Sequence, residues 1–329
     1  MASVLVVGEL DGDVLQSITG ELLAAARGIN DVTGDEVGVA LLNGSEAAGQ
    51  AAIALGADKA YLVQDDVLAD LQLDAQVAAL AHVCSEVAPS AVLIGRTLAG
   101  RDVGPRLAFR MGVGLAQDCL QVSADADSGR IVAIRPVYGG NALAKVTFPD
   151  ANPQMVVLRG KAYEPLEADG SRAGETVVIN PSLDASVVKA RLVETVTQES
   201  EGVRLEDANV VVGGGRGLGG PEPFDQLEDL AKLLGGAVGA SRAVCDAGWL
   251  DHSYQVGLTG KTITPDLYIT VGISGASQHM AGCSASKSIV AINRDADANI
   301  FKSASYGVVG DWKNVLPSFI ETVRELVDS

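Results

Sequence analysis

The chain is short of aromatic residues, cysteine, histidine and basic residues, and these shortages argue against several classes of site. Only 4% of its 329 residues are aromatic. The cysteines are Cys84, Cys119, Cys245 and Cys283, and the histidines are His82, His252 and His279. No two cysteines form a CxxC pair and the histidines have no metal-ligand spacing, so we expect no zinc, iron–sulfur or other metal site and no disulfide framework.

Positive charge is scarce as well. The chain has 24 basic and 42 acidic residues, a formal net charge of −18, which repels nucleic acid and anionic membrane surfaces. No apolar run reaches the roughly 18 residues of a membrane span, so we expect no direct membrane insertion. The N-terminal MASVLVVGEL enters a strand without a basic start or a cleavage pattern. The expected location is cytoplasmic.

Apolar residues make up 47% of the chain, and in the first half they alternate between strand-like and helix-like periods. The predicted strands are Ser3–Gly8, Glu36–Leu42, Ala60–Val63 and Ala91–Gly95. The predicted helices are Val14–Arg27, Ser45–Leu55, Asp74–Val87 and Ala99–Met111. This βαβα order predicts an α/β fold with a mostly parallel sheet.

The pattern then changes to strands with short turns. Four strands, which we expect to form an antiparallel extension of the first domain, are Leu120–Ser123, Ile131–Arg135, Ala142–Phe148 and Met155–Arg159. Two further strands are expected at Thr176–Ile179 and Val187–Val196. Residues 198–207 (QESEGVRLED) are polar and weakly periodic, which is typical of a linker. The predicted domains are therefore 1–197 and 198–329.

The second half repeats one unit several times, an apolar run followed by a glycine turn and a helical pattern. The five runs read VVGGGRGL, GASRAVCDAGW, QVGLTGKT, YITVGISGASQH and SIVAIN. Strands are predicted at the start of the first run, Ala208–Val212, and of the fourth, Leu267–Val271. In α/β proteins such turns bring backbone N–H groups to phosphates. Polar residues differ from turn to turn, which favours one large nucleotide-like cofactor that spans several turns.

Two of these runs resemble known phosphate-binding motifs but depart from them. Gly215, Gly217 and Gly220 match G-x-G-x-x-G, yet no acidic residue follows at the distance that a dinucleotide site requires. QVGLTGKT ends like a Walker A loop, but Gln255 replaces its first glycine and no buried strand precedes it. We interpret it as a false P-loop. An NAD-binding enzyme of similar form stays an alternative hypothesis.

The turns carry cations and hydroxyls instead of general acids or nucleophiles. Ser241 is placed to cap a helix, and an arginine beside it opposes the helix dipole, so Arg242 is expected to have another task. Ser274 and Ser277 are placed to cap the helix start at 276–279, where the dipole would lower the pKa of His279. With no Ser-His-Asp order and no paired carboxylates, the pattern favours a cofactor holder over a hydrolase.

The motifs GGRGL, GASR…DAGW, QVGxTGK, YITVGISGASQH and SKSIVAIN, in this order and at these distances, resemble the α subunit of electron transfer flavoprotein. The resemblance is strongest over residues 210–312 and extends to RPVYGGNAL, residues 135–143. It implies two domains, each with a mostly parallel sheet flanked by helices. The C-terminal domain would be a doubly wound FAD-binding domain, and the N-terminal domain would contact a β subunit.

The resemblance also implies a function and partners. The chain would form a heterodimer with the β subunit of electron transfer flavoprotein, with one FAD held in this chain. It would be an electron carrier without substrate turnover of its own. Electrons would come from acyl-CoA dehydrogenases of fatty acid β-oxidation and other flavin dehydrogenases. They would leave one at a time for a quinone oxidoreductase of the membrane. Whether a bifurcating form with a second flavin is involved stays open.

The resemblance carries over residue by residue. The positions that would contact FAD are Arg216, Ser241, Arg242, Val256, Gly257, Leu258, Thr259, Ser274, Gly275, Ala276, Ser277, Gln278, His279, Asn293, Asp311 and Trp312. Arg242 would lie over the isoalloxazine, Thr259 near N5 and His279 near the C2 carbonyl. Asn293 and the turn at Asp311 would hold the adenosine and phosphate part. A cation or donor near the C2 carbonyl raises the potential of the flavin.

The chain departs from the family pattern at three places. Leu258 stands where a glutamine is usual, Asp251 replaces a usual proline after DAGW, and GLGGPE lacks the Lys-Ser that often follows GRGL. A third hypothesis, a non-redox scaffold that has lost its ligand, is disfavoured because Arg216, Arg242 and His279 are all present.

Overall fold

The computed structural model describes residues 3–70, 72–138, 142–148, 150, 152–190, 193, 203–206 and 208–327. It divides the chain into two compact units, Met1–Val196 and Thr197–Ser329, and each is described on its own. Of the predicted linker, residues 198–202 and 207 lie outside the described residues. Leu205 departs from the linker predicted there, because the residue is only 5% exposed and packs in the core of unit 2.

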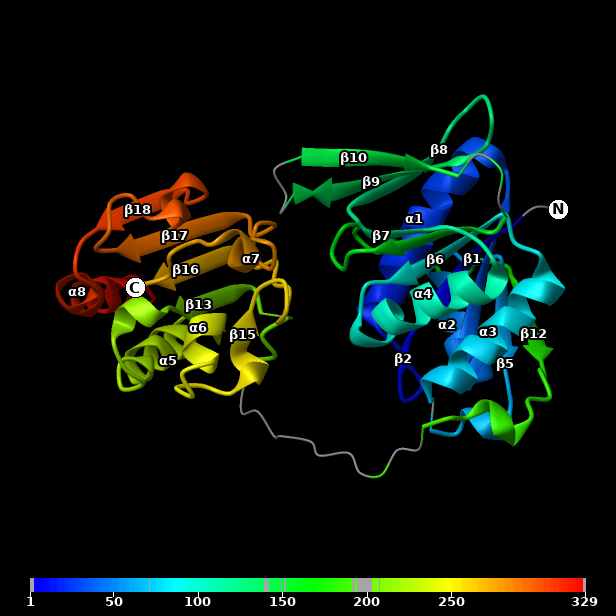
Figure 1. Ribbon diagram of the computed structural model, residues 1–329, viewed down its shortest axis with the longest axis horizontal. Coiled ribbons are helices and arrows are strands. Elements are labelled where there is room, and N and C mark those ends of the chain that lie inside the picture. The colour runs from blue at the N-terminus through cyan, green and yellow to red at the C-terminus, as the bar shows by residue number, and fades with distance from the viewer. Residues whose placement is uncertain are drawn as a thin grey trace. The chain divides into compact units, whose positions relative to one another are not determined.

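A parallel sheet forms the centre of unit 1 (Figure 1). Within the described residues its strands are β1 (Ser3–Gly8), β4 (Glu36–Leu42), β5 (Lys59–Val63), β6 (Ala91–Gly95), β7 (Leu115–Cys119), β11 (Gln154–Leu158) and β12 (Glu175–Ile179). They lie in the order β12-β5-β4-β1-β6-β11-β7, and every neighbouring pair is parallel. The predicted parallel α/β sheet is confirmed.

Helices cover both faces of this sheet. They are α1 (Ser17–Thr33), α2 (Glu46–Ala54), α3 (Leu73–Val87) and α4 (Leu98–Met111), and two 3₁₀ turns, η1 and η3, lie at Asp66–Leu68 and Ala185–Val187. Apolar residues of α1 and α2 share one core cluster, and those of α3 and α4 share another. The helix expected from Val14 begins later, at Ser17, because Val14 pairs with Asp11 in a short hairpin of β2 (Leu10–Asp11) and β3 (Val14–Leu15).

A small antiparallel sheet packs against α1. It consists of β8 (Gln121–Ala124), β9 (Ile131–Val137) and β10 (Ala142–Thr147), in the order β10-β9-β8. Val122, Ile131 and Ala133 are buried in the same core as α1. The predicted antiparallel extension is therefore right for these three strands. Residues 139–141 of the RPVYGGNAL motif lie outside the described residues.

Two strand predictions in unit 1 were wrong. The segment expected at Met155–Arg159 is not part of the antiparallel extension, since β11 lies in the main sheet, parallel to β6 and β7. All five residues of β11 are buried, which a central position explains. At the expected strand Val187–Val196, Val187 ends a 3₁₀ turn and residues 188–190 are irregular, while 191–192 and 194–196 lie outside the described residues.

Unit 2 has its own parallel sheet. Its strands in the described chain are β13 (Val210–Gly214), β14 (Ala237–Ser241), β15 (Gln255–Val256), β16 (Leu267–Val271), β17 (Ser288–Asn293) and β18 (Tyr306–Val309), in the order β15-β14-β13-β16-β17-β18. Numbered within the unit, this is 3-2-1-4-5-6, the order of a doubly wound nucleotide-binding fold. The predicted fold class is confirmed for both units.

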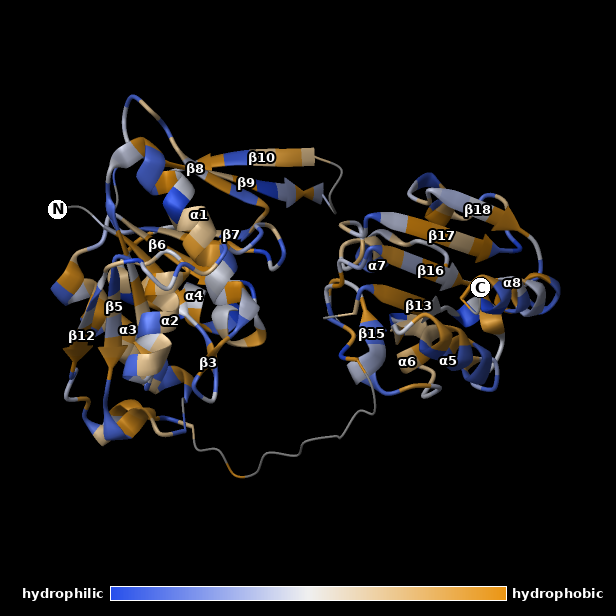
Figure 2. Cartoon of the chain, turned by 180° about the vertical axis from the view of Figure 1, so that it is seen from behind, coloured by the Kyte–Doolittle hydropathy of each residue, from blue (hydrophilic) through white to orange (hydrophobic). Residues whose placement is uncertain are grey.

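The two faces of the unit 2 sheet are covered differently. The helices are α5 (Phe224–Leu233), α6 (Arg242–Cys245), α7 (Ser277–Met280) and α8 (Trp312–Val327), and the 3₁₀ turns η4, η5 and η6 lie at Arg216–Leu218, His252–Tyr254 and Asn299–Lys302. One core cluster contains α5, α6 and α8, and the other is closed mainly by loops, α7 and η6. Figure 2 shows α5 with both hydrophilic and hydrophobic residues, as expected for a helix with one buried face.

The described residues contain neither a membrane-spanning helix nor a cluster of metal ligands. No helix there is long and apolar enough to cross a membrane. No group of three or more histidine, cysteine, aspartate or glutamate side chains there could hold a metal ion.

Candidate functional site

All sixteen residues singled out from the sequence lie at the carboxyl ends of the unit 2 strands or on the loops that follow them. Arg216 follows β13, and Ser241 with Arg242 ends β14 and starts α6. Residues 256–259 begin at the last residue of β15 and continue into the loop after it, and residues 274–279 follow β16. Asn293 is the last residue of β17, and residues 311–312 follow β18. Because the strands are parallel, their carboxyl ends share one edge of the sheet. The fold therefore gathers these residues at that edge, called here the carboxyl edge of unit 2.

The order of the strands reverses between β13 and β16, where doubly wound folds bind ligands. The loops after these two strands pack backbone against backbone. The amide of Gly215 donates to Val271 O at 2.9 Å, and the amide of Gly217 donates to Gly272 O at 3.1 Å. A Cβ on Gly215 would lie 2.1 Å from Gly272 O. These glycines therefore let the two loops approach each other.

The loop after β16 leaves polar groups available. Gly275 has φ +75°, and a Cβ there would lie 2.2 Å from the amide nitrogen of Ile300. Ser274, Ala276 and the two residues after it are exposed. In the described part of the chain, the backbone N–H groups of Ser274, Gly275 and Ala276 donate no hydrogen bond. Consecutive free N–H groups of this kind bind anions and carbonyl oxygens.

The helix caps expected from the sequence were wrong for α7 and right only in position for α6. Ala276, not Ser274 or Ser277, is the N-cap of α7, and no side chain caps that helix. Ser241 does occupy the N-cap position of α6, but its side chain makes no capping hydrogen bond. Both helices are only four residues long, so a cap contributes little there. The hydroxyl groups of Ser241, Ser274 and Ser277 therefore do not cap the N-termini of these helices.

Arg242 lies at the start of α6 with its side chain 67% exposed. Its Nε donates to Asp246 Oδ2 at 3.2 Å, one helical turn further along. An exposed pair with this spacing contributes only about 0.3–0.5 kcal/mol. The guanidinium is therefore weakly held and accessible to a ligand.

The sequence predicted that the loop after β15 only resembles a P-loop, and the structure agrees. Lys261, the residue in the place of the Walker lysine, pairs with Glu206 at 2.9 Å, and no helix follows it. The loop instead packs on α7, where the amide of Leu258 donates to Gln278 O at 2.7 Å. A buried side chain that the sequence reasoning missed, Gln255, donates through Nε2 to Thr259 Oγ1 at 2.9 Å.

His279 is buried, with 7% of its surface exposed. Burial lowers its pKa to about 4, against the smaller opposite effect of a hydrogen-bonding contact with the Val256 backbone. The sequence attributed a lowered pKa to the helix dipole, and this cause was wrong, because α7 is a single turn and burial dominates. The imidazole is therefore neutral at pH 7. Its Nε2 lies 2.9 Å from the hydroxyl of Tyr268, and its buried Nδ1 makes no hydrogen bond of normal geometry to any described residue.

The loops after the last two strands are tied to the rest of the edge. Asn293 Nδ2 donates to Ile273 O at 2.9 Å, which links the end of β17 to the loop after β16. The amide of Gly310 donates to Asn293 O at 2.9 Å. Asp311 Oδ1 accepts from the amide of Lys313. Through Asn293, these hydrogen bonds connect the turn at 310–312 to the glycine loop after β16.

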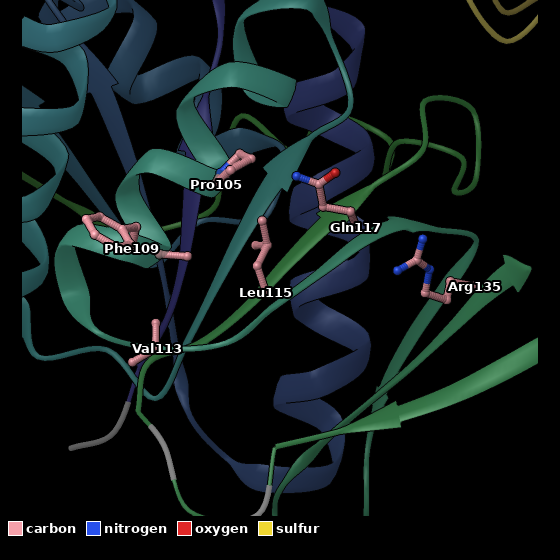
Figure 3. A pocket seen from close by; sticks show the side chains of 7 residues that line it. Pro105, Phe109, Val113, Leu115, Gln117 and Arg135 are labelled. Carbon is pink, nitrogen blue, oxygen red and sulfur yellow. The ribbon is translucent and has the colours of Figure 1, made fainter.

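Unit 1 carries a separate hollow of about 480 Å³. It is lined by Pro105, Ala108, Phe109, Val113, Leu115, Gln117 and Arg135. Figure 3 shows the labelled side chains coming from α4, from β7, from β9 and from the loop between α4 and β7. Phe109 is 88% exposed at this hollow, and the buried Nε of Arg135 has no hydrogen-bond partner in the described chain.

Family models match both parts of the chain. The electron transfer flavoprotein domain matches residues 4–184, and the electron transfer flavoprotein FAD-binding domain matches residues 204–284. The chain belongs to the electron transfer flavoprotein α-subunit family. Proteins of this family are electron carriers.

Three relatives match over nearly their whole length, and each is named as an electron transfer flavoprotein subunit α. The protein of Megasphaera elsdenii is 42% identical over 98% of this chain and 96% of its own. That of Bacillus subtilis is 40% identical over 98% of both chains. That of Thermoanaerobacterium thermosaccharolyticum is 40% identical over 95% of this chain and 94% of its own. The resemblance inferred from the ordered motifs is thereby confirmed.

Proposed function

We propose that this chain is the α subunit of a flavin-containing electron carrier and holds one FAD at the carboxyl edge of unit 2. One observation carries the proposal: the loops that follow the unit 2 strands meet at the edge where doubly wound folds bind nucleotides. The residues there fit FAD, because they combine a glycine cradle, free backbone donors and a buried imidazole nitrogen that makes no hydrogen bond of normal geometry to any described residue.

The phosphates of FAD would lie against the glycine loops. Backbone N–H groups of Ser274, Gly275 and Ala276 are free to donate to phosphate oxygens, and Arg216 is an exposed cation at the neighbouring loop. Asn293 and the turn at Asp311 would hold the adenosine part, as the family motifs imply.

When bound, the flavin supplies redox chemistry that can take up and release electrons singly or in pairs. The chain supplies charge and hydrogen bonds around it. Arg242 brings a positive charge that stabilises the reduced, anionic form. Gln255 already donates to Thr259 Oγ1, so the Thr259 hydroxyl proton is free to donate to a flavin nitrogen. The remaining predicted contacts are the backbone and side chains of Val256, Gly257, Leu258, Ser277, Gln278 and Trp312.

The partner of unit 1 would be the β subunit of electron transfer flavoprotein. Exposed apolar side chains of this size mark contact surfaces when they gather. On α4, Leu98 is 84% and Phe109 is 88% exposed, and Phe109 borders the hollow of unit 1. We place the heterodimer contact on this surface, defined by Leu98, Phe109 and the hollow.

Electrons would come from acyl-CoA dehydrogenases and other flavin dehydrogenases and leave for a quinone oxidoreductase of the membrane. The carrier would work in the cytoplasm without a substrate of its own, as part of fatty acid β-oxidation. Support for this role comes from the family, whose members are electron carriers.

The test is co-expression of the chain with a β subunit. The purified complex should be yellow, with a flavin absorbance spectrum and about one FAD released per α chain. It should accept electrons from a reduced acyl-CoA dehydrogenase but not turn over acyl-CoA by itself. A stable complex that is colourless and takes up no added FAD would overturn the proposal.

A further inference from the structure

One side chain next to the proposed FAD site has no assigned role. Tyr268 lies in β16, is 0% exposed, and packs with its ring 6.1 Å from the ring of His279. Its hydroxyl lies 2.9 Å from His279 Nε2. A tyrosine that is fully buried in a parallel strand must satisfy its hydroxyl, and here the imidazole does so.

The hydroxyl is held in place from the other side. A Cβ on Gly213 of β13 would lie 2.4 Å from the Tyr268 hydroxyl and 2.8 Å from its ring. The neighbouring strand therefore carries a glycine where any side chain would push the tyrosine away. Glycine at position 213 therefore leaves the room that the Tyr268 hydroxyl occupies beside β13.

The direction of the Tyr268–His279 hydrogen bond decides which imidazole nitrogen carries the proton. If Nε2–H donates, the Tyr268 hydroxyl proton has no acceptor, because His279 is its sole hydrogen-bond partner in the described chain. If the hydroxyl donates to Nε2, that proton is satisfied and the imidazole proton lies on Nδ1. The second arrangement leaves one buried group unpaired instead of two, so it is favoured.

We propose that Tyr268 is a positioning residue that donates to His279 Nε2 and thereby fixes the Nδ1–H tautomer, which makes Nδ1 the donor that this imidazole offers to FAD. The inference rests on the proposed FAD site. Burial lowers the pKa of His279 to about 4 and raises that of Tyr268 well above its ordinary value, so both groups are neutral at pH 7. A neutral imidazole carries its proton on one of its two nitrogens, and Tyr268 determines which nitrogen of His279 that is.

The direct test is the ¹⁵N spectrum of the α–β complex with labelled histidine. The chain has three histidines, so a His279→Gln variant assigns the signals of His279. We expect a protonated Nδ1 and an unprotonated Nε2 in the wild-type complex. A protonated Nε2 would overturn the proposal without any further variant.

Two variants test the cause. Tyr268→Phe removes the donor and should convert His279 to a mixture of tautomers, lower the flavin potential and weaken FAD binding about tenfold. Gly213→Ala keeps the hydroxyl but displaces it, so it should shift the tautomer signals in the same direction. Tyr163→Phe is the control, because the Tyr163 hydroxyl bonds the Val122 backbone in unit 1 and should leave His279 and the potential unchanged.

The outcomes separate this inference from the proposed function. If the complex holds no FAD, the function fails. If FAD is bound and Tyr268→Phe leaves both the tautomer and the potential unchanged, the role of Tyr268 fails while the function stands.

Discussion

Burial controls the chemistry of single residues at the carboxyl edge of unit 2. It lowers the pKa of His279 to about 4 and raises that of Cys283, whose Sγ lies 3.5 Å from His279 O, to about 12. Both side chains are therefore neutral at pH 7, and Cys283 has no reactive thiolate. The cations of the edge, Arg216 and Arg242, are exposed instead. The charged side chains of this edge therefore lie at the surface, and its neutral imidazole and thiol lie in the interior.

The shifted pKa of His279 predicts a pH dependence of stability. Between about pH 6.5 and 4 the unfolded chain binds a proton on this imidazole that the folded chain does not. The free energy of unfolding is therefore complete above pH 6.5 and falls as the pH drops to 4, by on the order of 3 kcal/mol. Urea unfolding followed by tryptophan fluorescence measures it, since Trp249 and Trp312 both lie in unit 2.

The control for this prediction is His279→Gln, which cannot gain the proton. Carboxylates also titrate in this range, so only the difference between the two proteins counts. Between pH 7 and 4 the variant should lose less stability than the wild type. Equal losses would show that His279 does not cause the dependence.

Arg242→Ala should lower the reduction potential of the flavin in the α–β complex. The exposed guanidinium is free to stabilise the reduced, anionic form, and its loss should leave folding largely unchanged because the pair with Asp246 is weak. An anaerobic redox titration gives the midpoint. Lys232→Ala is a matched control, since Lys232 is an exposed cation paired one turn away with Glu228 in α5. An unchanged midpoint for Arg242→Ala would refute its assigned role.

At the scale of elements, the loops of the carboxyl edge are built by backbone-to-backbone packing. The loop after β13 contacts Gly272, and the loop after β16 contacts Ile300. Side chains would separate these loops, so glycine is required for packing as well as for backbone conformation. A short helix follows β14 directly and another follows the loop after β16, which leaves N–H groups and hydroxyls available at the edge.

This packing predicts a difference between two glycines. Both Gly275 (φ +75°) and Gly235 (φ +61°) adopt a left-handed conformation, but a Cβ on Gly235 meets nothing within 4 Å. Gly235→Ala should therefore cost about 1–2 kcal/mol of unfolding free energy from the conformation alone. Gly275→Ala should cost clearly more and weaken FAD binding, because the loop after β16 must move away from Ile300. Urea unfolding and flavin titration measure both effects, and equal losses for the two variants would contradict the packing argument.

At the scale of the whole molecule, each unit is a doubly wound parallel sheet with its own cores. Unit 2 concentrates polar loops at its carboxyl edge, whereas unit 1 exposes large apolar side chains on α4. The two units thus offer different surfaces, and we propose that of unit 2 for the cofactor and that of unit 1 for the protein partner.

The assignment of unit 1 to partner binding predicts the effect of Phe109→Glu. A charge in place of a side chain that is 88% exposed should leave the fold intact but weaken the contact with the β subunit at least tenfold. Co-purification and analytical ultracentrifugation measure the contact. Val178→Glu, at a 59% exposed position on the edge strand β12, is the control and should assemble normally. Normal assembly of Phe109→Glu would place the contact elsewhere.

Much of the fold follows from local pattern. Strands such as Ser3–Gly8 and Leu267–Val271 were predicted at their observed bounds, because continuous apolar runs between turn signals are typical of buried parallel strands. Elements whose pattern depends on distant neighbours were missed or misplaced. β11 resembled its antiparallel predecessors along the chain, and only its insertion between β6 and β7 made it part of the main sheet.

The sequence by itself determined the α/β class, the family and the residues that gather at the carboxyl edge, because motif order and apolar period are properties of the chain. The tertiary structure alone decided how those residues are held. Gln255 and Tyr268 lie within the quoted motifs, but their roles could not be predicted from them, since these roles depend on contacts with Thr259 and His279. Burial, which sets the charge of His279, likewise depends on the packing of segments far apart in the chain.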